Sequence, residues 1–263
     1  VIEGFGCPLP QGFLRAMAER PNPPVWLNLE YLSAEDWVED CHGLPSTHPQ
    51  TGLIQHFWFP GFSPRTGGLL REMNLLAQRD RFQADGSAQT AFWFRIGVPE
   101  ALQAERRLSL FAYENPAIAG WLQALADGVG RSVVVVPAGR ALADVAKWAG
   151  RESLAPGDRV QCRQVTVIVL PFLSHEDYDR LLWACDLNAV RGEDSFVRAQ
   201  WAGRPLLWHI YPQDEDAHWI KLEAFMAQVE RHAAMPALWN EAMRAWNRGE
   251  TTPEFWAAVH ADQ

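Results

Sequence analysis

Apolar and polar positions follow two periods along the chain, and from residue 108 onward segments of the two periods alternate regularly. Short apolar runs predict strands, and apolar residues spaced three or four apart predict helices. The predicted elements are, in order, a strand at 108–113, a helix at 117–126, a strand at 132–136, a helix at 141–149, a strand at 165–172 and a helix capped by Ser174 that reaches Cys185. Near the C-terminal end, a strand is predicted at 205–210 and a helix at 214–232. Such alternation indicates a parallel sheet with helices on both faces, as in a Rossmann-like α/β domain.

The first third of the chain differs in composition and is rich in proline, glycine and aromatic residues. Apolar runs predict strands at 1–5 and 25–28, and Ser33 is a candidate N-cap for a helix at 34–41. The polar stretch Gln78–Thr90 predicts a linker. The domain boundary is therefore predicted at 84/85, with one domain over 1–84 and a second over 85–263.

Composition limits the classes of partner. The 263 residues are 48% hydrophobic, enough for a sizeable core, and carry a formal net charge of −9 with a pI near 5.4. This charge argues against nucleic acid or an anionic membrane as the main partner. No apolar run approaches a membrane span, the start lacks a signal-peptide pattern, and the four cysteines form no C-x-x-C motif. These features predict a cytoplasmic protein.

The most informative motif is Arg191–Phe196, where an apolar strand at 187–190 passes into a helix at 195–202 that Gly203 ends. Free N–H groups and the positive dipole end at the start of a helix attract phosphate. Arg191 adds a fixed cation, and Ser195 is able to cap the helix or donate to a phosphoryl oxygen. The motif predicts a phosphate or diphosphate site. The alternative is a solvated loop in which Arg191 pairs with a neighbouring carboxylate and Ser195 only caps the helix.

Aromatic and polar residues follow the other predicted strands. Because parallel strands end at one edge of the sheet, and ligands bind there, these residues are expected to converge on one crevice. They are Tyr113, Phe172, His175 and Tyr211. An aromatic ring beside a phosphate-binding turn suits a nucleoside diphosphate ligand. For each residue a purely structural role stays open: core or strand-end packing for the three rings, and a solvated first helical turn for His175.

Other chemistries have weaker support in the sequence. It contains no G-x-x-x-x-G-K-[ST], no G-x-G-x-x-G and no G-x-S-x-G motif. Cys41, His42 and His48 are candidate metal ligands, but their spacing matches no strong template, so a loop with scattered polar residues is the favoured alternative.

The run Arg191–Phe196, continued through Val197–Gln200 and Arg204–Glu215, closely resembles the signature of the EarP family, the bacterial protein-arginine rhamnosyltransferases that modify elongation factor P. Further stretches carry the same resemblance over most of the chain. They are Pro171–Phe172, Asp177–Asp179, Trp26–Glu35 and Phe57–Ser63.

This resemblance implies a GT-B architecture of two Rossmann-like domains, the first incomplete at its N-terminus. It implies transfer of L-rhamnose from dTDP-β-L-rhamnose to one arginine guanidinium of elongation factor P, with inversion and with no metal or other cofactor. The implied site residues divide by role. Phe172 stacks on thymine; Tyr113 and His175 line the nucleotide pocket; Arg191, Ser195 and Tyr211 hold the diphosphate; and Glu193 and Asp194 lie beside the ribose or the sugar, where they are catalytic candidates.

Two departures from the family pattern matter. Family members usually carry glutamine at the position of His175. The family also begins with a D-N-x-G-D-x-G loop that supplies the favoured general-base aspartate, and this chain starts at Val1, at what is normally a later strand. The 263 residues are therefore predicted to bind the donor weakly and to transfer poorly. The alternatives are a GT-B glycosyltransferase or sugar-nucleotide epimerase with another donor, and a non-catalytic binding module.

Overall fold

The computed structural model describes residues 1–103, 105–232 and 237–252, which form two compact units. One unit contains Val1–Arg71 and a later segment that starts at Pro212, and the other contains Glu72–Tyr211 and the C-terminal part of the chain. Each unit is built on its own mostly parallel sheet, so the predicted α/β class with two Rossmann-like domains is confirmed.

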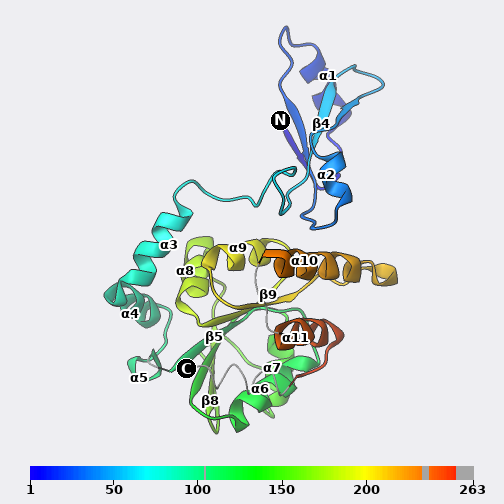
Figure 1. The fold of residues 1–263 in the computed structure, drawn as a ribbon. Helices are drawn as coiled ribbons and strands as arrows, with labels where there is room; N and C mark the ends of the chain where they lie inside the picture. The colour runs from blue at the N-terminus through cyan, green and yellow to red at the C-terminus, as the bar shows by residue number, and fades with distance from the viewer. Residues whose placement is uncertain (104, 233–236, 253–263) are drawn as a thin grey trace. The chain divides into compact units, whose positions relative to one another are not determined.

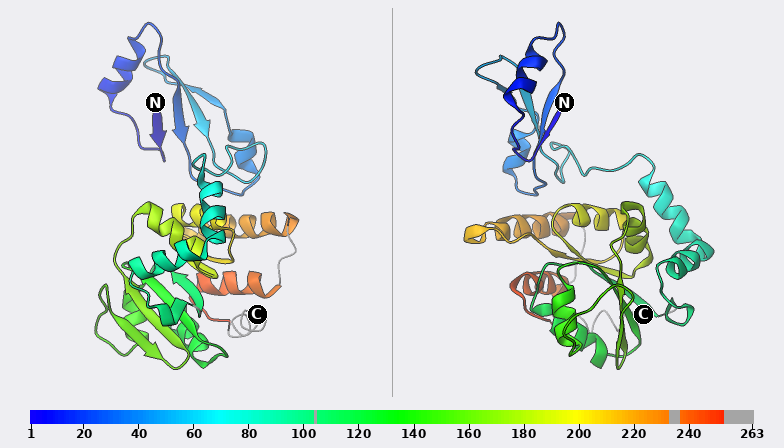
Figure 2. Two further views of the ribbon diagram at one scale, coloured as in Figure 1. Left: turned by 90° about the vertical axis from the view of Figure 1, so that its left-hand side faces the viewer. Right: turned by 180° about the vertical axis from the view of Figure 1, so that it is seen from behind.

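The first unit is organised on a four-stranded sheet of order β1-β2-β4-β3, in which β3 alone runs antiparallel to its neighbour. Its elements are β1 (Ile2–Gly4), α1 (Gln11–Ala18), β2 (Trp26–Leu29), α2 (Trp37–Cys41), β3 (Pro45–Thr47), β4 (Ile54–Trp58) and α10 (His218–His232). Leu14 and Met17 of α1 pack with Trp26 and Leu53 into a small core. Figure 2 shows β1, β2 and β4 pointing the same way.

The second unit is organised on a six-stranded sheet of order β10-β9-β5-β6-β8-β7, with β7 antiparallel to β8. Its strands are β5 (Arg106–Leu110), β6 (Ser132–Pro137), β7 (Arg159–Cys162), β8 (Val165–Leu170), β9 (Leu187–Arg191) and β10 (Leu206–His209). Its helices are α3 (Leu75–Ala84), α4 (Gly86–Arg95), α5 (Glu100–Gln103), α6 (Ala117–Asp127), α7 (Leu142–Trp148), α8 (His175–Ala184), α9 (Asp194–Ala202) and α11 (Ala237–Arg248). Every residue of β6 and β8 is buried, as expected for central strands covered on both faces.

Helices cover both faces of this second sheet, with α8 and α9 on one face and α6, α7 and α11 on the other (Figure 1). The chain moves from β5 through β6 to β8 along one direction of the sheet, then crosses back to β9 on the other side of β5. This reversal places a topological switch point between β5 and β9. In doubly wound sheets the ligand crevice lies at the carboxyl ends of the two strands at such a point.

The predicted linker at Gln78–Thr90 is wrong, because the structure has α3 and α4 there. The polar residues that suggested a linker make specific contacts instead. The Gln83 side chain donates to the carbonyl oxygens of Trp183, at 3.1 Å, and Ala202, at 3.2 Å, while Phe82 is buried and Asp85 caps α4. Since α3 packs on α8 and α9, the boundary between the compact units lies at Glu72, ahead of the predicted 84/85. The assignment of acceptor and donor roles to two domains stays a prediction.

Two helix starts also differ from prediction. Helix α2 begins at Trp37, because Ser33 forms a local turn in which its Oγ accepts from the Glu35 N–H and donates to the Glu35 carboxylate. A short 3-10 turn, Asp214–Asp216, precedes α10 where one continuous helix was expected. By contrast, Ser174 caps α8 as predicted, since its Oγ accepts from the Asp177 N–H at 3.2 Å. Of the helices that the structure describes, none has the length and apolarity that crossing a membrane requires.

Candidate functional site

Arg191 lies at the switch point of the second sheet, as the last residue of β9. Its guanidinium carbon is 4.4 Å from the centroid of the Phe111 ring and 4.8 Å from that of Tyr113. Both rings follow β5, the neighbouring strand. Cation–π contact with two rings restricts the rotamers of a long side chain. The cation predicted from the sequence is therefore held in place at the carboxyl edge.

Tyr113 connects Arg191 to the end of β10. Its ring centroid is 5.6 Å from that of Tyr211 and 5.3 Å from that of His209, both in edge-to-face geometry. Burial raises the pKa of the Tyr113 phenol above its ordinary value, and the positive charge of Arg191 opposes this only in part. The Tyr113 hydroxyl consequently stays protonated at neutral pH and is able to donate a hydrogen bond to an anionic ligand.

Gly192 forms the turn between β9 and α9 and requires a left-handed backbone, with φ +60. Its N–H donates to the His209 carbonyl oxygen at 3.0 Å, and its own carbonyl oxygen accepts from Trp208 Nε1 at 2.6 Å. A Cβ at this position would lie 2.8 Å from the Tyr113 hydroxyl oxygen. Glycine is therefore needed both for the φ value and for the close approach of Tyr113.

Ser195 is not the N-cap of α9, as the sequence allowed, because the helix begins one residue earlier with Glu193 at the cap position. The buried Ser195 Oγ donates instead to the Arg191 carbonyl oxygen at 2.8 Å, which closes the turn. A hydroxyl has one proton to donate. A phosphate contact from this side chain would require the hydroxyl to rotate, whereas the N–H groups of the first helical turn have no intrahelical acceptor.

Glu193 and Asp194 place two carboxylates at the start of α9. Glu193 is half-buried at the cap position, and Asp194 is exposed as the first helical residue. Carboxylates near a helix N-terminus are stabilised by its dipole, and they repel a phosphate that approaches too closely. They lie two and three residues after Arg191, beside the turn that Gly192 forms. Their catalytic roles stay predictions.

Phe172 and His175 follow β8, which β6 separates from β5 in the sheet. Phe172 is 77% exposed, and His175 is the exposed first residue of α8. Tyr178 of the same helix contacts Phe111, with ring centroids 5.5 Å apart. The structure thus places Tyr113, Arg191 and Tyr211 in one cluster, with Phe172 and His175 at the same edge of the sheet.

Two residues of this edge were not singled out in the sequence. Phe111 precedes Tyr113 by two residues, so strand alternation was a signal that both rings share a face. Arg140 follows β6 and pairs with Glu114 at 3.6 Å, both side chains being exposed. Its charge is close enough to favour the ionised form of Tyr113. The loop after β6 was expected at this edge, but an isolated arginine in a loop carries no signal of its own.

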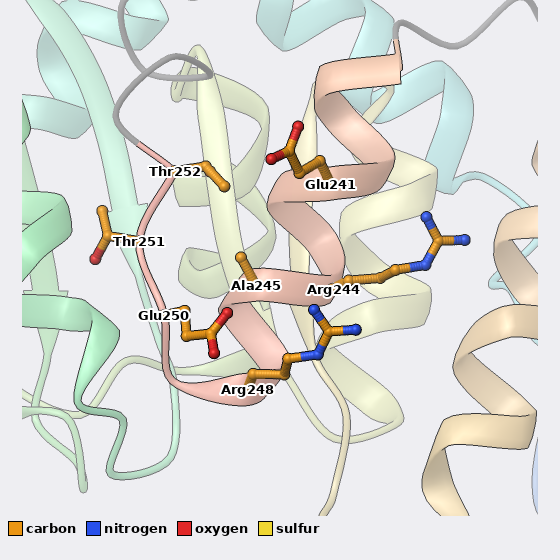
Figure 3. Close-up of a pocket in the computed structure, with 7 residues that line it drawn as sticks. All are labelled: Glu241, Arg244, Ala245, Arg248, Glu250, Thr251 and Thr252. Carbon is orange, nitrogen blue, oxygen red and sulfur yellow. The ribbon is translucent and has the colours of Figure 1, made fainter.

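The remaining polar clusters lie elsewhere. Among residues 1–103, 105–232 and 237–252, no three His, Cys, Asp or Glu side chains are grouped to hold a metal ion. His42, at the end of α2, accepts through Nδ1 from the N–H of Phe59, which follows β4, at 3.1 Å. A pocket of about 290 Å³ lies along α11 (Figure 3), and its lining contains none of the eight predicted site residues. It is lined by Glu241, Arg244, Ala245, Arg248, Glu250, Thr251 and Thr252.

Comparison with known proteins agrees with the resemblance seen in the sequence. The protein-arginine rhamnosyltransferase of Pseudomonas aeruginosa PAO1 is 55% identical over 263 residues, and that of Pseudomonas putida KT2440 is 53% identical over 265. Each match covers 98% of this chain and 69% of the relative. A solved structure described as the structural basis for EarP-mediated arginine glycosylation of translation elongation factor EF-P has a TM-score of 0.67 and 34% identity, covering 90% of this chain and 88% of its own.

A family model described as elongation factor P (EF-P) rhamnosyltransferase EarP matches residues 1–263. The match extends over both sheets, including the turn that holds Arg191. The chain belongs to the EarP family of rhamnosyltransferases.

Proposed function

We propose that the chain transfers L-rhamnose from dTDP-β-L-rhamnose to an arginine guanidinium of elongation factor P, with inversion at the anomeric carbon, in the cytoplasm. The second unit is the donor-binding domain, and the two units form the domains of a GT-B enzyme. The donor site is inferred mainly from Arg191, whose guanidinium lies over two aromatic rings beside the N-terminus of α9. The names of the Pseudomonas relatives support the rhamnosyl group and the arginine acceptor.

The proposed donor contacts divide into three groups. Exposed Phe172 stacks on thymine, and His175 and Tyr113 provide hydrogen bonds around the nucleoside. Arg191, Ser195, Tyr211 and the N–H groups at the start of α9 hold the diphosphate. Glu193 and Asp194 face the sugar.

Charge development explains why this arrangement favours transfer. The diphosphate gains negative charge as the glycosidic bond breaks, and a fixed guanidinium with a helix N-terminus stabilises that charge more in the transition state than in the ground state. These groups perform the role that a divalent cation plays elsewhere, so we propose that transfer needs no metal. Activity unchanged by EDTA would support this part, and activity restored only by added Mg²⁺ or Mn²⁺ would contradict it.

Binding of dTDP-rhamnose to Arg191→Ala tests the donor site. Loss of a charge-assisted contact is expected to cost about 1.5–3 kcal/mol, or roughly 10- to 150-fold in Kd. Arg131→Ala is the matched control. Arg131 precedes β6 at the amino-terminal edge of the same sheet, and its side chain is 57% exposed and pairs with Glu105. Equal affinities of the Arg191 variant and wild type would remove Arg191 from the site.

Competition between nucleotides separates this proposal from a glycosyltransferase or epimerase with another donor. dTDP is expected to displace the bound donor at lower concentration than UDP, and the reverse order would favour the other donor. Incubation with elongation factor P and dTDP-rhamnose, followed by mass spectrometry of the acceptor, measures transfer. Donor binding without any transfer would contradict the proposed activity and favour a non-catalytic binding module, whereas efficient rhamnosylation would refute that alternative.

A further inference from the structure

The carboxyl edge of the first sheet carries an exposed aromatic pair. Strands β1, β2 and β4 are parallel, and the hydrogen-bond ladder continues past their ends: the Phe5 N–H donates to the Leu29 carbonyl oxygen at 2.8 Å, and the Glu30 N–H donates to that of Trp58 at 2.9 Å. The rings of Phe5 and Tyr31 then lie with centroids 4.6 Å apart and planes tilted by 30°. Phe5 is 43% exposed and Tyr31 is 53% exposed. The pair therefore presents ring surface to solvent at the edge where parallel sheets bind ligands.

The backbone that holds this pair is strained. Phe5 and Gly6 are the central residues of a tight turn, closed by a hydrogen bond from the Cys7 N–H to the Gly4 carbonyl oxygen at 3.1 Å, and both have positive φ, +56 and +65. Glycine or asparagine is favoured at the first of these positions, and phenylalanine there costs about 1–2 kcal/mol. Phe5 is 43% exposed, so its burial offsets this cost only in part. Strain retained at an exposed position is typical of functional sites.

The electrostatics around the pair favour a cation. The carboxylate next to the pair in sequence is that of Glu30. Glu30 follows β2 directly opposite Phe5 and precedes Tyr31, and its Oε1 accepts from Asn28 Nδ2 at 2.6 Å, which orients the carboxylate. The Tyr31 ring already has a cation near it, since Lys221 Nζ lies 5.7 Å from the ring centroid. Ring faces and carboxylates together attract positive groups.

We propose that Phe5, Tyr31 and Glu30 form the subsite that receives the side chain of the acceptor arginine, with the guanidinium stacked on the exposed ring surface and its N–H groups directed to the carboxylate. This inference rests on the proposed arginine acceptor and adds the residues that recognise it. A planar guanidinium suits the subsite better than an ammonium, because it stacks on rings and binds carboxylates through two parallel hydrogen bonds. The arginine displaces Lys221 from the Tyr31 ring when it binds.

Substitutions of Tyr31 distinguish ring stacking from simple apolar contact. Affinity for elongation factor P is measured with the full chain, by calorimetry, for wild type, Tyr31→Leu and Tyr31→Phe. Leu keeps apolar bulk without a ring face and is expected to weaken binding roughly 3- to 30-fold, whereas Phe keeps the ring face and is expected to restore wild-type affinity within about twofold. Glu30→Gln is expected to weaken binding by a similar factor. Phe13→Ala is the matched control, since Phe13 is 48% exposed on α1 of the same unit.

The same preparations are tested for binding of dTDP-rhamnose, which none of these substitutions is expected to change by more than about twofold. An elongation factor P whose acceptor arginine is replaced by lysine is expected to bind wild type more weakly. Equal affinities of the Leu and Phe variants, or of the arginine and lysine acceptors, would overturn the subsite, and so would absence of any acceptor binding by wild type. None of these outcomes affects the donor-binding test with Arg191→Ala. Failure of the acceptor subsite can therefore be distinguished from failure of the proposed donor site.

Discussion

The residues at the carboxyl edge are held more firmly in the second sheet than in the first. In the second sheet every residue of β6 and β8 is buried, and the edge groups are tied together: Arg191 lies on two rings, and Gly192 is hydrogen-bonded to β10 through both its N–H and its carbonyl oxygen. In the first sheet every residue of β3 is exposed, and Phe5 and Tyr31 at the edge contact each other through their rings. A buried platform suits a small anionic ligand that must be oriented accurately, and an exposed edge suits a protein side chain that arrives from outside.

Ion pairs show the same contrast. In the second unit Arg198 of α9 pairs with two carboxylates, the buried one of Asp179 on α8 and that of Glu72. Arg198 Nε lies 2.7 Å from Asp179 Oδ1, and Arg198 Nη1 lies 2.6 Å from Glu72 Oε2. In the first unit Arg65 also bridges two carboxylates, those of Glu39 at 2.9 Å and Asp40 at 2.6 Å, but Arg65 is 62% exposed and Asp40 is 79% exposed. The two arginine bridges have similar geometry and differ in burial. Substitutions in both bridges therefore test the comparison between the two units directly.

The largest effect is expected from Asp179→Asn. The change removes the buried carboxylate from Arg198 and leaves Glu72 as its charged partner, so the expected cost is about 2 kcal/mol in the free energy of unfolding. The matched change Asp40→Asn is expected to cost less than about 1 kcal/mol, because water solvates the Arg65 guanidinium that it leaves behind. Urea unfolding at pH 7 measures both. Equal costs would mean that burial does not distinguish the two bridges.

A smaller effect is expected from Gly192→Ala, compared with Gly52→Ala in the first unit. Both glycines have positive φ, +60 and +71, so each alanine is expected to cost about 1 kcal/mol of stability. A Cβ at Gly52 meets no atom within 4 Å, whereas a Cβ at Gly192 meets the Tyr113 hydroxyl at 2.8 Å. Gly192→Ala alone is therefore expected to displace Tyr113 and to weaken donor binding roughly tenfold, about 1.4 kcal/mol. Titration of both variants with dTDP-rhamnose decides this, and an equal donor affinity of the two would show that Tyr113 tolerates the methyl group.

The strands of the second sheet were easier to predict from the sequence than the side-chain contacts of the helices in the same unit. Runs such as Val133–Val136 are β-branched and continuous, which is typical of a strand buried on both faces, and the Ser174 cap is a local signal. The mistaken linker had no local signal, since the polar residues of α3 are stabilised by partners about 100 residues away. Gln83, for example, reaches carbonyl oxygens of α8 and α9. Polarity alone does not distinguish a linker from a helix whose hydrogen bonds are made in the tertiary structure.

The residue types of the candidate site, and the carboxyl edge of the sheet on which they lie, were predictable from the sequence. The contacts between the side chains were less predictable. Arg191, Tyr113 and Tyr211 follow neighbouring strands, and their clustering follows from parallel-strand topology alone. The place of Phe111 under the guanidinium depends on which rotamer Arg191 adopts, and the bond from Ser195 to the Arg191 carbonyl depends on where α9 begins. Both are set by packing after the fold forms, so no motif encodes them.

The smallest effect is expected from acid titration of Asp177, on α8 of the second unit. Burial opposes ionisation of this carboxyl, but hydrogen bonds from Arg180 at 2.8 Å and Arg95 at 2.7 Å outweigh it and hold the pKa below its ordinary value of 3.8. A carboxyl with a lowered folded-state pKa stabilises the fold above its unfolded pKa, and this contribution is lost as pH falls through the folded value. Arg95 belongs to α4, so the loss is expected to loosen α4 from the start of α8.

Asp177→Asn removes this contribution at every pH. The variant is therefore expected to be less stable than wild type by about 1 kcal/mol or less at pH 7, because the carboxylate is partly exposed and screened by solvent. The difference is expected to shrink below pH 4, where the wild-type carboxyl takes up its proton. Urea unfolding of both proteins between pH 7 and pH 3 measures the convergence. A difference that stays constant to pH 3 would mean that Asp177 contributes through hydrogen-bond geometry and not through its charge, and that the firmer edge of the second sheet owes nothing to this ion pair.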